Sequence, residues 1–446
     1  MTLYHSTNRS ISSCSDQASF ETALFSGIAP DNGLFVPNNI PKFSFDEIKA
    51  MKDISYSDIA FTVLNKFLKN EINDKDLETI VQDAYNFEIP FEKFNNNTSI
   101  VRLDKGPTLS FKDFAARFMA RAMQALKKDN GRMMILVATS GDTGSAIGSS
   151  FKGLKGIDVV ILYPKGEVTA FQKYQMDSLG ENIKTIEVDG KFDDCQKMVK
   201  AAFDDLDLEH IRLTSANSIN IGRILPQIVY YFYSFLQCSK DLSPIIFSVP
   251  SGNFGNSLGC EIARRMGLPV KKIIIAVNEN DEFPRFLDER EYHIISPSRA
   301  CLSNAMNVGN PSNLARYFEL YGGCIDKDGI IHKMPDVDQM KTKLFSVSVS
   351  DDDTIRTMQE VYQNKNIIIE PHGAVGIHAL GKYRKETNDD SYAVVLETAD
   401  PIKFSESVEN ILNIDIKLDK FSKDNTYDTI GNDYNEFKKK LLVFNK

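Results

Sequence analysis

The feature that most constrains the fold of this chain is an alternation of short apolar runs with stretches of helical periodicity. Buried strands that alternate with helices form mainly parallel sheets, which predicts an α/β fold. Ligands of such sheets bind beyond the carboxyl ends of the strands, so the loops that follow the strands are where we expect a site. The strand-like runs between residues 133 and 399 are MMILVA, DVVILYP, IKTIEV, PIIFSVP, KKIIIAVN, NIIIEP and YAVVLETA.

The two ends of the chain have other patterns. Residues 1 to about 88 contain several stretches with apolar positions three or four apart, which predicts a mostly helical unit. The polar run FEKFNNNTS at 91–99 predicts a boundary or a surface loop. After about residue 420 we expect a polar link and a short closing helix without a chemical role.

Composition excludes several classes of function. The 446 residues are 42% hydrophobic and 25% charged, as in soluble globular proteins of two or three domains. The formal net charge of -9 gives no electrostatic footprint for nucleic acid or an anionic membrane. No apolar run approaches the roughly 18 residues that span a bilayer, and the first residues lack the apolar core of a secretory signal. We therefore expect a small-molecule ligand and a cytoplasmic location.

The six cysteines are widely separated along the chain. Neither a CxxC pair nor a cysteine and histidine cluster at zinc spacing occurs among them. We therefore expect reduced thiols, which fit the cytoplasm, and no metal site.

One lysine stands in an unusual position, in the stretch GPTLSFKDF at 106–114. Ser110 and Asp113 form an S-x-x-D capping pattern ahead of a helical apolar face, which predicts that Lys112 lies in the first turn of a helix. A cation at that end of a helix is disfavoured by roughly 0.3–1 kcal/mol, and burial also favours the neutral amine. A neutral lysine can form a Schiff base with an aldehyde, although an isolated lysine here is more often a surface charge.

Two Gly-containing loops follow strand-like runs. In VPSGNFGNSLG, Gly252 and Gly255 allow a ligand to approach the backbone, and the N–H groups of the next helix predict a phosphate cradle. The loop has neither a Walker lysine nor GxGxxG spacing, which argues against a nucleoside triphosphate or a dinucleotide. In ATSGDTGSAIG, Ser140, Asp142 and Thr143 suit a carboxylate or phosphate, unless the loop is an ordinary capped turn.

Three further loops carry polar residues. SANSINIGR supplies Ser215, Asn217, Asn220 and Arg223, which are either helix caps or partners of a phosphate. Thr398, after the run YAVVLETA, is either a sheet hydroxyl bonded to backbone or a ligand contact. His372, in IEPHGAVG, is either a proton donor or a histidine packed at a domain interface.

Together these loops resemble the threonine synthases, enzymes of fold type II (tryptophan synthase β-like) that use pyridoxal 5'-phosphate (PLP). The motifs that match, in the order of that family, are DNGLFVP at 31–37, GPTLSFKDF, TSGDTG, SANSIN, SVPSGNFGN and ETADPIKF. The resemblance implies that Lys112 carries PLP as a Schiff base, that Thr398 meets the pyridine nitrogen and that Asp142 lies near O3'. It implies that the PLP phosphate is bound by Gly252, Asn253, Phe254, Gly255 and Asn256. The implied substrate contacts are Ser140, Thr143, Ser215, Asn217, Asn220 and Arg223.

The resemblance also implies a reaction, in which O-phospho-L-homoserine and water give L-threonine and phosphate. Lys112 would act as general base at Cα and then carry protons at Cβ. Two alternatives stay open: a phospho-lyase that releases 2-oxobutyrate from the same substrate, and a non-catalytic relative that binds ligands. The turn LDKG has Asp104 and Lys105 where the family commonly has Phe and His, and TADP has Asp400 where it has His.

The resemblance further implies two three-layer α/β domains with PLP at their cleft, preceded by the helical N-terminal segment. We expect a helical domain at 1–88, a large domain at 89–112 and 216–420, a smaller inserted domain at 113–215, and a tail at 421–446. Domain closure over the substrate is expected, because it would exclude water from reactive intermediates. The chain is expected to be a monomer or a homodimer.

Overall fold

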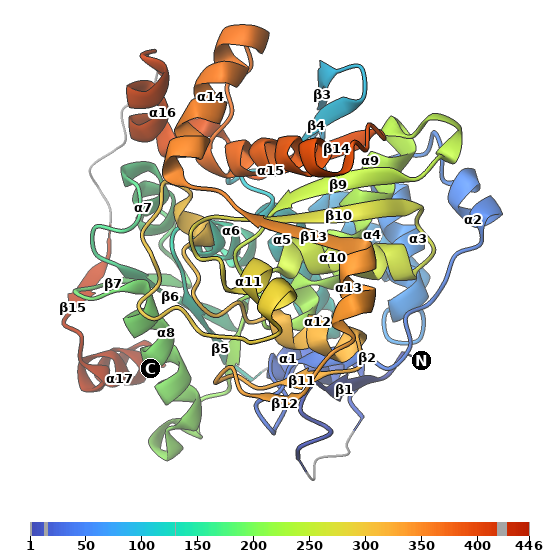
Figure 1. Ribbon diagram of the computed structural model, residues 1–446. Helices are drawn as coiled ribbons and strands as arrows, with labels where there is room; N and C mark the ends of the chain where they lie inside the picture. Colours follow the sequence, from blue (N-terminus) through green and yellow to red (C-terminus); the bar gives the residue numbers. More distant parts are fainter. Residues whose placement is uncertain (1, 13–16, 130, 417–425, 446) are drawn as a thin grey trace.

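Two sheets with helices on both faces form the framework of the molecule (Figure 1). The computed structural model describes residues 2–12, 17–129, 131–416 and 426–445. The larger sheet has the strand order β13-β10-β9-β14-β4-β3, and only β3 is antiparallel to its neighbour. Its strands are β3 (Phe91–Asn95), β4 (Thr98–Arg102), β9 (Ile245–Pro250), β10 (Val270–Val277), β13 (Leu344–Ser348) and β14 (Ala393–Glu397). The α/β class is confirmed.

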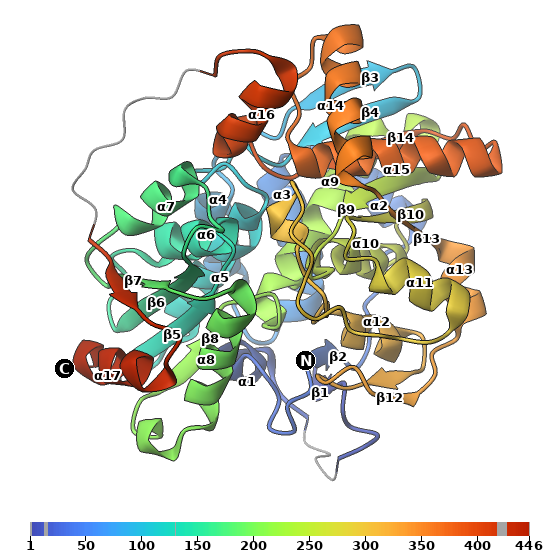
Figure 2. The ribbon, with the colours of Figure 1, turned by 60° about the vertical axis from the view of Figure 1, so that its left-hand side comes forward.

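The smaller sheet has the order β15-β7-β6-β5-β8, with all of its described pairs parallel. Helices α5 and α6 pack on one face, and α8 and α17 pack on the other (Figure 2). The strands are β5 (Met133–Ala138), β6 (Ile157–Pro164), β7 (Ile183–Val188), β8 (Leu213–Ser215) and β15 (Asp428–Ile430). The helices are α5 (Lys112–Leu126), α6 (Asp142–Phe151), α7 (Ala170–Asp177), α8 (Phe192–Asp204) and α17 (Tyr434–Phe444).

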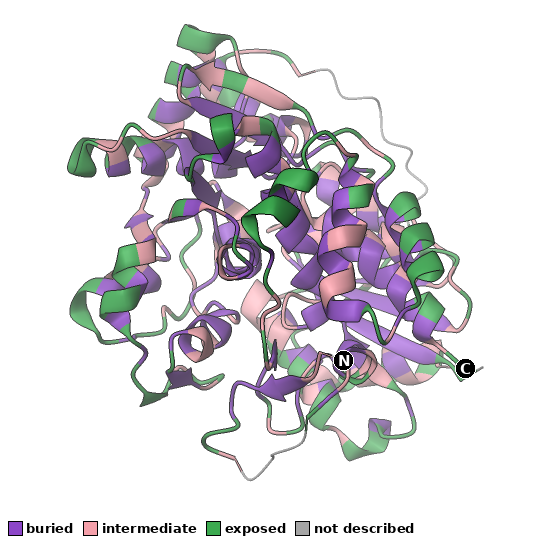
Figure 3. Cartoon of the chain, turned by 90° about the vertical axis from the view of Figure 1, so that its right-hand side faces the viewer, coloured by how far each residue is buried: buried purple, intermediate pink, exposed green. Residues whose placement is uncertain are grey.

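Both faces of the large sheet are buried, as continuous apolar strands require (Figure 3). Along β10, Ile273 and Ile275 join one apolar cluster, while Ile274 and Ala276 join the other. This alternation follows from the period of two in a strand. The helices around this sheet are α9 (Val229–Cys238), α10 (Gly255–Arg265), α11 (Glu282–Glu289), α12 (Leu314–Leu320), α13 (Val337–Lys343), α14 (Asp351–Lys365), α15 (Pro371–Thr387) and α16 (Ser405–Leu412).

The N-terminal segment contains the predicted helices and packs against α5 and α9. It also contains a short antiparallel pair of strands, β1 (Tyr4–Ser6) with β2 (Phe35–Pro37), which the helical prediction missed. A second short pair joins β11 (Cys324–Ile325) to β12 (Ile331–Lys333). The helices are α1 (Phe20–Ser26), α2 (Phe45–Ala50), α3 (Tyr56–Leu68) and α4 (Asp74–Ala84).

The predicted loop FEKFNNNTS is wrong, because these residues form β3, a turn and the start of β4. Asn95 ends β3, Asn96 and Asn97 form the turn, and every residue of β4 is buried. The predicted strand NIIIEP is also wrong: residues 366–370 have no regular structure. Asn366 ends α14 in the left-handed region and Pro371 begins α15, which leaves too short a segment for a strand in the sheet.

The closing helix is confirmed by α17, while the predicted link at 421–425 lies outside the described residues. The tail prediction missed strand β15, which pairs in parallel with β7 at the edge of the smaller sheet. Since α17 packs beside α8, the end of the chain completes one layer of this sheet. Among the described residues, no helix has the length and apolar character needed to cross a bilayer.

Candidate active site

A cavity at the carboxyl ends of β5, β9 and β14 gathers most of the predicted site residues. This position agrees with the general rule for ligands of parallel sheets. The predicted residues that line it are Lys112, Ser140, Asp142, Thr143, Asn217, Arg223, Gly252, Asn253, Phe254, Gly255, Asn256 and Thr398. Ser215 instead lines a larger cavity that adjoins this one.

Asn220 is fully buried, and its amide is already bonded to the backbone of the protein. It donates to the carbonyls of Leu24 and Ser215 at 2.8 and 2.9 Å, and it accepts from the N–H of Gly222 at 2.9 Å. These bonds connect helix α1 to the SANSIN loop. The contacts therefore give Asn220 a supporting position behind the cavity wall and do not support direct contact with a substrate.

Lys112 is the first residue of α5, as predicted. Its side chain is largely buried, and Nζ lies 3.2 Å from Oδ2 of Asp142. Burial lowers the pKa of Lys112, and the carboxylate of Asp142 opposes this change. The direction of the predicted effect, toward the neutral amine, is thus confirmed.

The predicted S-x-x-D cap before Lys112 is wrong. Residue 111 is in the N-cap position without a side-chain cap, and Ser110 Oγ has no hydrogen-bond partner among the described atoms. The Asp113 carboxylate turns back to accept from the backbone N–H and the hydroxyl of Thr108, at 2.8 and 2.6 Å. A local side-chain bond has replaced the cap, and it fixes the turn that leads into Lys112.

The loop after β9 has the geometry of an anion cradle. Phe254 adopts a left-handed conformation with φ of 61°, after which α10 begins at Gly255. Asn256 ties the loop to β9 by donating to the carbonyl of Pro250 at 2.7 Å, and it accepts from the N–H of Ser257 at 2.9 Å. The first N–H groups of a helix lack intrahelical acceptors, so those of Gly255 and Asn256 are available to a phosphate.

Backbone hydrogen bonds hold the lysine loop against the end of β14. The N–H of Phe111 donates to the carbonyl of Thr398 at 2.9 Å, and the N–H of Asp400 donates to that of Leu109 at 3.0 Å. These bonds hold the backbone at Thr398 beside the start of α5. Lys112 and Thr398 therefore line the same cavity from neighbouring segments.

Asp142 lies at the start of α6 and is almost fully buried. Burial alone would raise its pKa, but the ammonium groups of Lys112 and Lys403 hold the pKa of this carboxyl well below its usual range. Gln172 of α7 adds a hydrogen bond of 2.9 Å to Oδ1. Gly141, with φ of 124°, leaves the space that the Gln172 amide occupies, because a Cβ there would collide with it.

Comparisons with known proteins decide the family. The description "Pyridoxal-phosphate dependent enzyme" matches residues 88–398, "Threonine synthase N terminus" matches 3–85, and "Threonine synthase, C-terminal" matches 373–431. Threonine synthase from Escherichia coli is 40% identical over 409 residues, covering 91% of each chain. That from Buchnera aphidicola of Schizaphis graminum is 39% identical over 437 residues, covering 96% of this chain and 97% of the relative. The chain belongs to the threonine synthase family.

Solved structures agree with this assignment. The crystal structure of Escherichia coli threonine synthase superimposes with a TM-score of 0.88 at 36% identity, covering 99% of this chain and all of the other. PLP-bound threonine synthase from Brucella melitensis gives 0.89 at 30% identity, with full coverage of both chains. The protein is a PLP-dependent lyase with threonine synthase activity, and these relatives do not favour the phospho-lyase alternative.

The residues of the cavity fit PLP. A threonine synthase needs an amine for the aldehyde of PLP, donors for its phosphate and a partner for its ring nitrogen, and the cavity offers Lys112, the start of α10 and Thr398. A neutral hydroxyl at the ring nitrogen does not hold a proton there as a carboxylate would. Gly252 also matters for the shape of the cradle, because a Cβ at this position would lie 2.7 Å from the carbonyl of Ala305.

Two residues that contact Asp142 behind the cavity lining were assigned no role by sequence reasoning. Lys403 is fully buried beside Asp142, although its motif ETADPIKF was noted only for Thr398. Gln172 lies on α7, where nothing in the sequence marked it. The signal that could have identified Lys403 is the one that identified Lys112, a lysine among apolar neighbours directly after a strand-end loop.

His372 lines the cavity, with both ring nitrogens engaged by protein atoms. Nδ1 is hydrogen-bonded to the carboxylate of Glu370, the N-cap of α15, and Nε2 accepts from the backbone N–H of Ala305 at 3.1 Å. In this arrangement Nδ1 carries the proton, and no N–H of the ring points into the cavity. The contacts support the packing interpretation of His372 over that of a proton donor.

The positions that depart from the family pattern contact one another. Asp104 is fully buried and receives the guanidinium of Arg102 on both of its oxygens. Lys105 Nζ lies 3.4 Å from Asp104 and 2.7 Å from Oδ2 of Asp400. The turn before the lysine loop and the loop after Thr398 are therefore linked by an ion pair.

Proposed function

We propose that this threonine synthase converts O-phospho-L-homoserine and water into L-threonine and phosphate, with the roles of the cavity residues as set out below. The observation that carries the proposal is the presence of two separate anion partners around one reactive lysine. The start of α10 forms one, and the guanidinium of Arg223 forms the other. A cofactor phosphate and a substrate phosphate can then be bound at the same time.

Arg223 is buried, and burial lowers its pKa to about 10, so it still carries its charge at neutral pH. One guanidinium nitrogen donates to the carbonyl of Ala216 at 2.7 Å, which orients the group. Its Nε has no hydrogen-bond partner among the described atoms. We assign this side chain to the phosphate of the substrate, because a buried donor without a partner is costly.

The substrate carboxylate is assigned to the start of α6. Ser140 and Thr143 flank the first turn, where hydroxyls and free N–H groups converge. Asn217 closes the same wall, held by its bond of 2.7 Å to the carbonyl of Ala138. With the carboxylate on α6 and the phosphate on Arg223, the carbon chain would extend past Lys112.

PLP, when bound, supplies an electron sink for the carbons of the substrate. Lys112 would hold PLP through its amine and, once displaced by the substrate amine, remove the proton at Cα. The same amine would then carry a proton at Cβ, where water adds. Thr398 would orient the ring through its hydroxyl, and Asp142 would hold its charge beside the lysine throughout.

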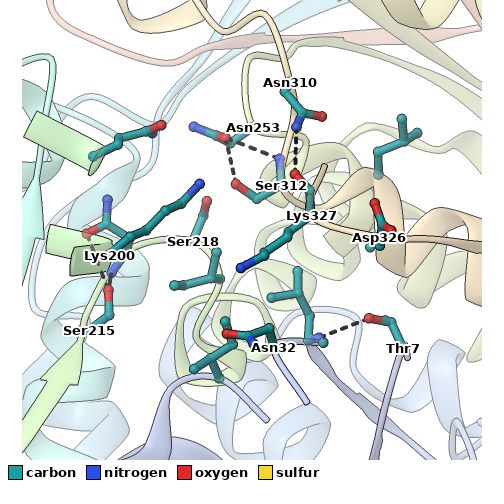
Figure 4. Close-up of a pocket in the computed structure, with 18 of the residues that line it drawn as sticks. Thr7, Asn32, Lys200, Ser215, Ser218, Asn253, Asn310, Ser312, Asp326 and Lys327 are labelled. Atoms are coloured by element: carbon teal, nitrogen blue, oxygen red, sulfur yellow. Dashed lines mark hydrogen bonds between the residues drawn. The ribbon is translucent and has the colours of Figure 1, made fainter. Parts of the chain in front are cut away.

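The larger cavity supports a phosphorylated substrate as well (Figure 4). It shares Ala138, Asn217, Ser218 and Asn253 with the candidate site, so the two cavities adjoin. Lys200 of α8 and Lys327 of the β11–β12 turn extend into it from different walls, together with Ser215 (Figure 4). We propose that the dianionic substrate enters, and phosphate leaves, along this cavity.

Asp204 and Asp326 also line this cavity, so the lysines are not its only charges. Asp326 accepts from His332 at 2.7 Å and from the N–H groups of Asp328 and Ile330 at 2.9 and 3.0 Å. Burial opposes the change, but these hydrogen bonds lower the pKa of Asp326, so its carboxylate is charged. An entering anion therefore meets two lysines together with two aspartates, and the lysine ammonium groups are its attractive partners.

The test is a product analysis. Purified protein is incubated with O-phospho-L-homoserine, and threonine, phosphate, 2-oxobutyrate and ammonia are quantified. We expect threonine and phosphate in equal amounts. Predominant 2-oxobutyrate and ammonia would identify the phospho-lyase reaction and overturn the proposal, and no turnover of this compound would overturn the choice of substrate.

We also propose the domain division given by the resemblance, at 1–88, 89–112 with 216–420, 113–215 and 421–446, with closure over the substrate. The smaller sheet supports it, since β5 to β8 fall inside 113–215. Identical structures with and without a substrate analogue would contradict closure. A cytoplasmic location is proposed because the described cysteines are free thiols, and a monomer or homodimer remains our expectation.

A further inference from the structure

Lys403 is a fully buried lysine that lies in the 3₁₀ turn η6 (Pro401–Phe404), directly after Thr398 and Asp400. Its ammonium group donates to the carbonyl of Thr108 at 2.6 Å and to Oε1 of Gln175 at 2.7 Å. It also lies 3.2 Å from Oδ1 of Asp142. A buried ammonium group needs such partners to offset the loss of its hydration, and here it has three oxygen partners, as many as it has N–H groups.

These partners come from three different segments around the site. Thr108 belongs to the turn before Lys112, Gln175 to α7, and Asp142 to the start of α6. Lys403 itself follows β14 of the large sheet. One side chain thus links the large sheet to two helices of the smaller one, at the point where the reactive lysine lies.

The carboxylate of Asp142 is shared between two lysines. Oδ2 lies 3.2 Å from Nζ of Lys112, and Oδ1 lies 3.2 Å from Nζ of Lys403. When Lys112 is uncharged, Asp142 still has an ammonium partner. Without Lys403, the buried carboxylate would have Lys112 as its only cationic partner at hydrogen-bonding distance among the described residues, and a charged Lys112 would be favoured.

We propose that Lys403 is a positioning residue. Its ammonium group pairs with the carboxylate of Asp142, so that Lys112 can be uncharged when it reacts. The inference rests on the proposed role of Lys112 and extends it to a residue that touches neither substrate nor PLP in that scheme. Lys403 acts through Asp142, and the partners of its ammonium group at hydrogen-bonding distance among the described residues are oxygen acceptors.

Other ionisable groups face Lys112 and Asp142, and they contribute to the direction in which the pKa of Lys112 is expected to shift. Arg223 acts on Lys112 in the same direction as Lys403, whereas His372 faces Asp142. Asp113 is turned toward Thr108, and its carboxylate is occupied there. Removing the Lys403 charge therefore raises the pKa of Lys112, and removing the Asp142 charge lowers it.

The experiment measures the rate at which the full-length chain, stripped of cofactor, takes up PLP across a range of pH. Only the neutral amine of Lys112 reacts with the aldehyde, so the midpoint of this profile reports the pKa of Lys112. We expect Lys403→Met to move the midpoint up by roughly one pH unit, and Asp142→Asn to move it down by a similar amount. In the double variant the midpoint should stay near that of Asp142→Asn, because Lys403 acts through Asp142.

Lys403→Arg keeps the charge and is the matched control, with a midpoint near that of the wild type. Shifts of Lys403→Met and Asp142→Asn in the same direction, or no shift in either, would overturn the proposal, because a purely structural role does not predict opposite signs. If Lys403→Met does not fold, Lys403→Gln replaces it, and a midpoint that fails to rise in that variant refutes the inference. The measurement needs no substrate, so a failure of the proposed reaction in the product analysis is distinguishable from a failure here.

Discussion

The ammonium of Lys105 lies 2.7 Å from Oδ2 of Asp400, although the two residues are 295 positions apart in the chain. The pair joins the turn before Lys112 to the loop after Thr398, and Lys112 and Thr398 themselves line the site. The residues that depart from the family pattern are thus partners of one another.

Breaking the ion pair between Lys105 and Asp400 should weaken the binding of PLP slightly. Lys105 is partly exposed, so the ion pair contributes no more than about 1 kcal/mol. We expect Lys105→Met and Asp400→Asn each to weaken PLP binding by about two- to fivefold, within that energy. Equilibrium dialysis of PLP measures the effect, and the exchanged pair Lys105→Asp with Asp400→Lys should recover part of it. Lys341→Met, which breaks the exposed Lys341–Asp288 pair far from the site, is the control.

Arg223→Met should affect the phosphate of the substrate more than the cofactor. A hydrogen bond to a charged group contributes about 1.5–3 kcal/mol, so kcat/KM should fall by about 10- to 100-fold. PLP content should stay that of the wild type, because the cofactor phosphate is assigned to α10. Arg212→Met, in an exposed ion pair with Asp129, is the matched control. Loss of PLP with unchanged kcat/KM per bound cofactor would show that the two phosphates have been assigned the wrong way round.

The lysines of the larger cavity should steer the substrate. Replacing Lys200 and Lys327 together by Met should lower kcat/KM by up to about tenfold at low salt, and the dependence of kcat/KM on salt should become weaker. The value of kcat should change little, because neither side chain lines the candidate site. Lys197→Met, on the same helix as Lys200 but outside the cavity lining, is the control. Unchanged kcat/KM and salt dependence would contradict the proposed route.

Glu282 should make the stability of the folded protein depend on pH. It is buried at the start of α11, Oε2 has no hydrogen-bond partner among the described atoms, and burial raises its pKa from 4.5 to about 8. The folded state therefore holds a proton that the unfolded state releases between these values, and stability is lost as pH rises through that range. Glu282→Gln should raise Tm by about 2–4 °C at pH 9 and change it little at pH 4. Calorimetry measures this, with Glu289→Gln at the exposed end of the helix as control.

Local patterns predicted the parts of the fold that depend on local forces. The periodicities identified β5, β6, β7, β9, β10 and β14, and the apolar face after Lys112 identified α5. The capping pattern failed because Asp113 has a nearer partner in Thr108, which the spacing of the letters does not reveal. Strand β4 was missed because its buried surface depends on its place between β14 and β3.

In the candidate site, too, some features could be predicted from the sequence and others could not. The sequence could predict the positions of Lys112, Thr398 and the residues after β9. Each of them follows the end of a strand, and strand ends meet at one edge of a parallel sheet. The charges around them are contacts at long range: Lys403 meets Thr108 across 295 positions, and Asp142 meets Lys112 across 30. Such pairs are formed by the packing of the two sheets. A single sequence does not indicate which lysine faces which carboxylate.

The central claim is that Lys112, and not its buried neighbour Lys403, carries the cofactor. The holoenzyme is treated with borohydride, which converts the bond between PLP and its lysine into a stable one, and the digested protein is mapped by mass spectrometry. The account predicts a pyridoxyl group on the peptide that contains Lys112 and none on the peptide that contains Lys403. A label on Lys403, or on a lysine outside the cavity, would contradict it.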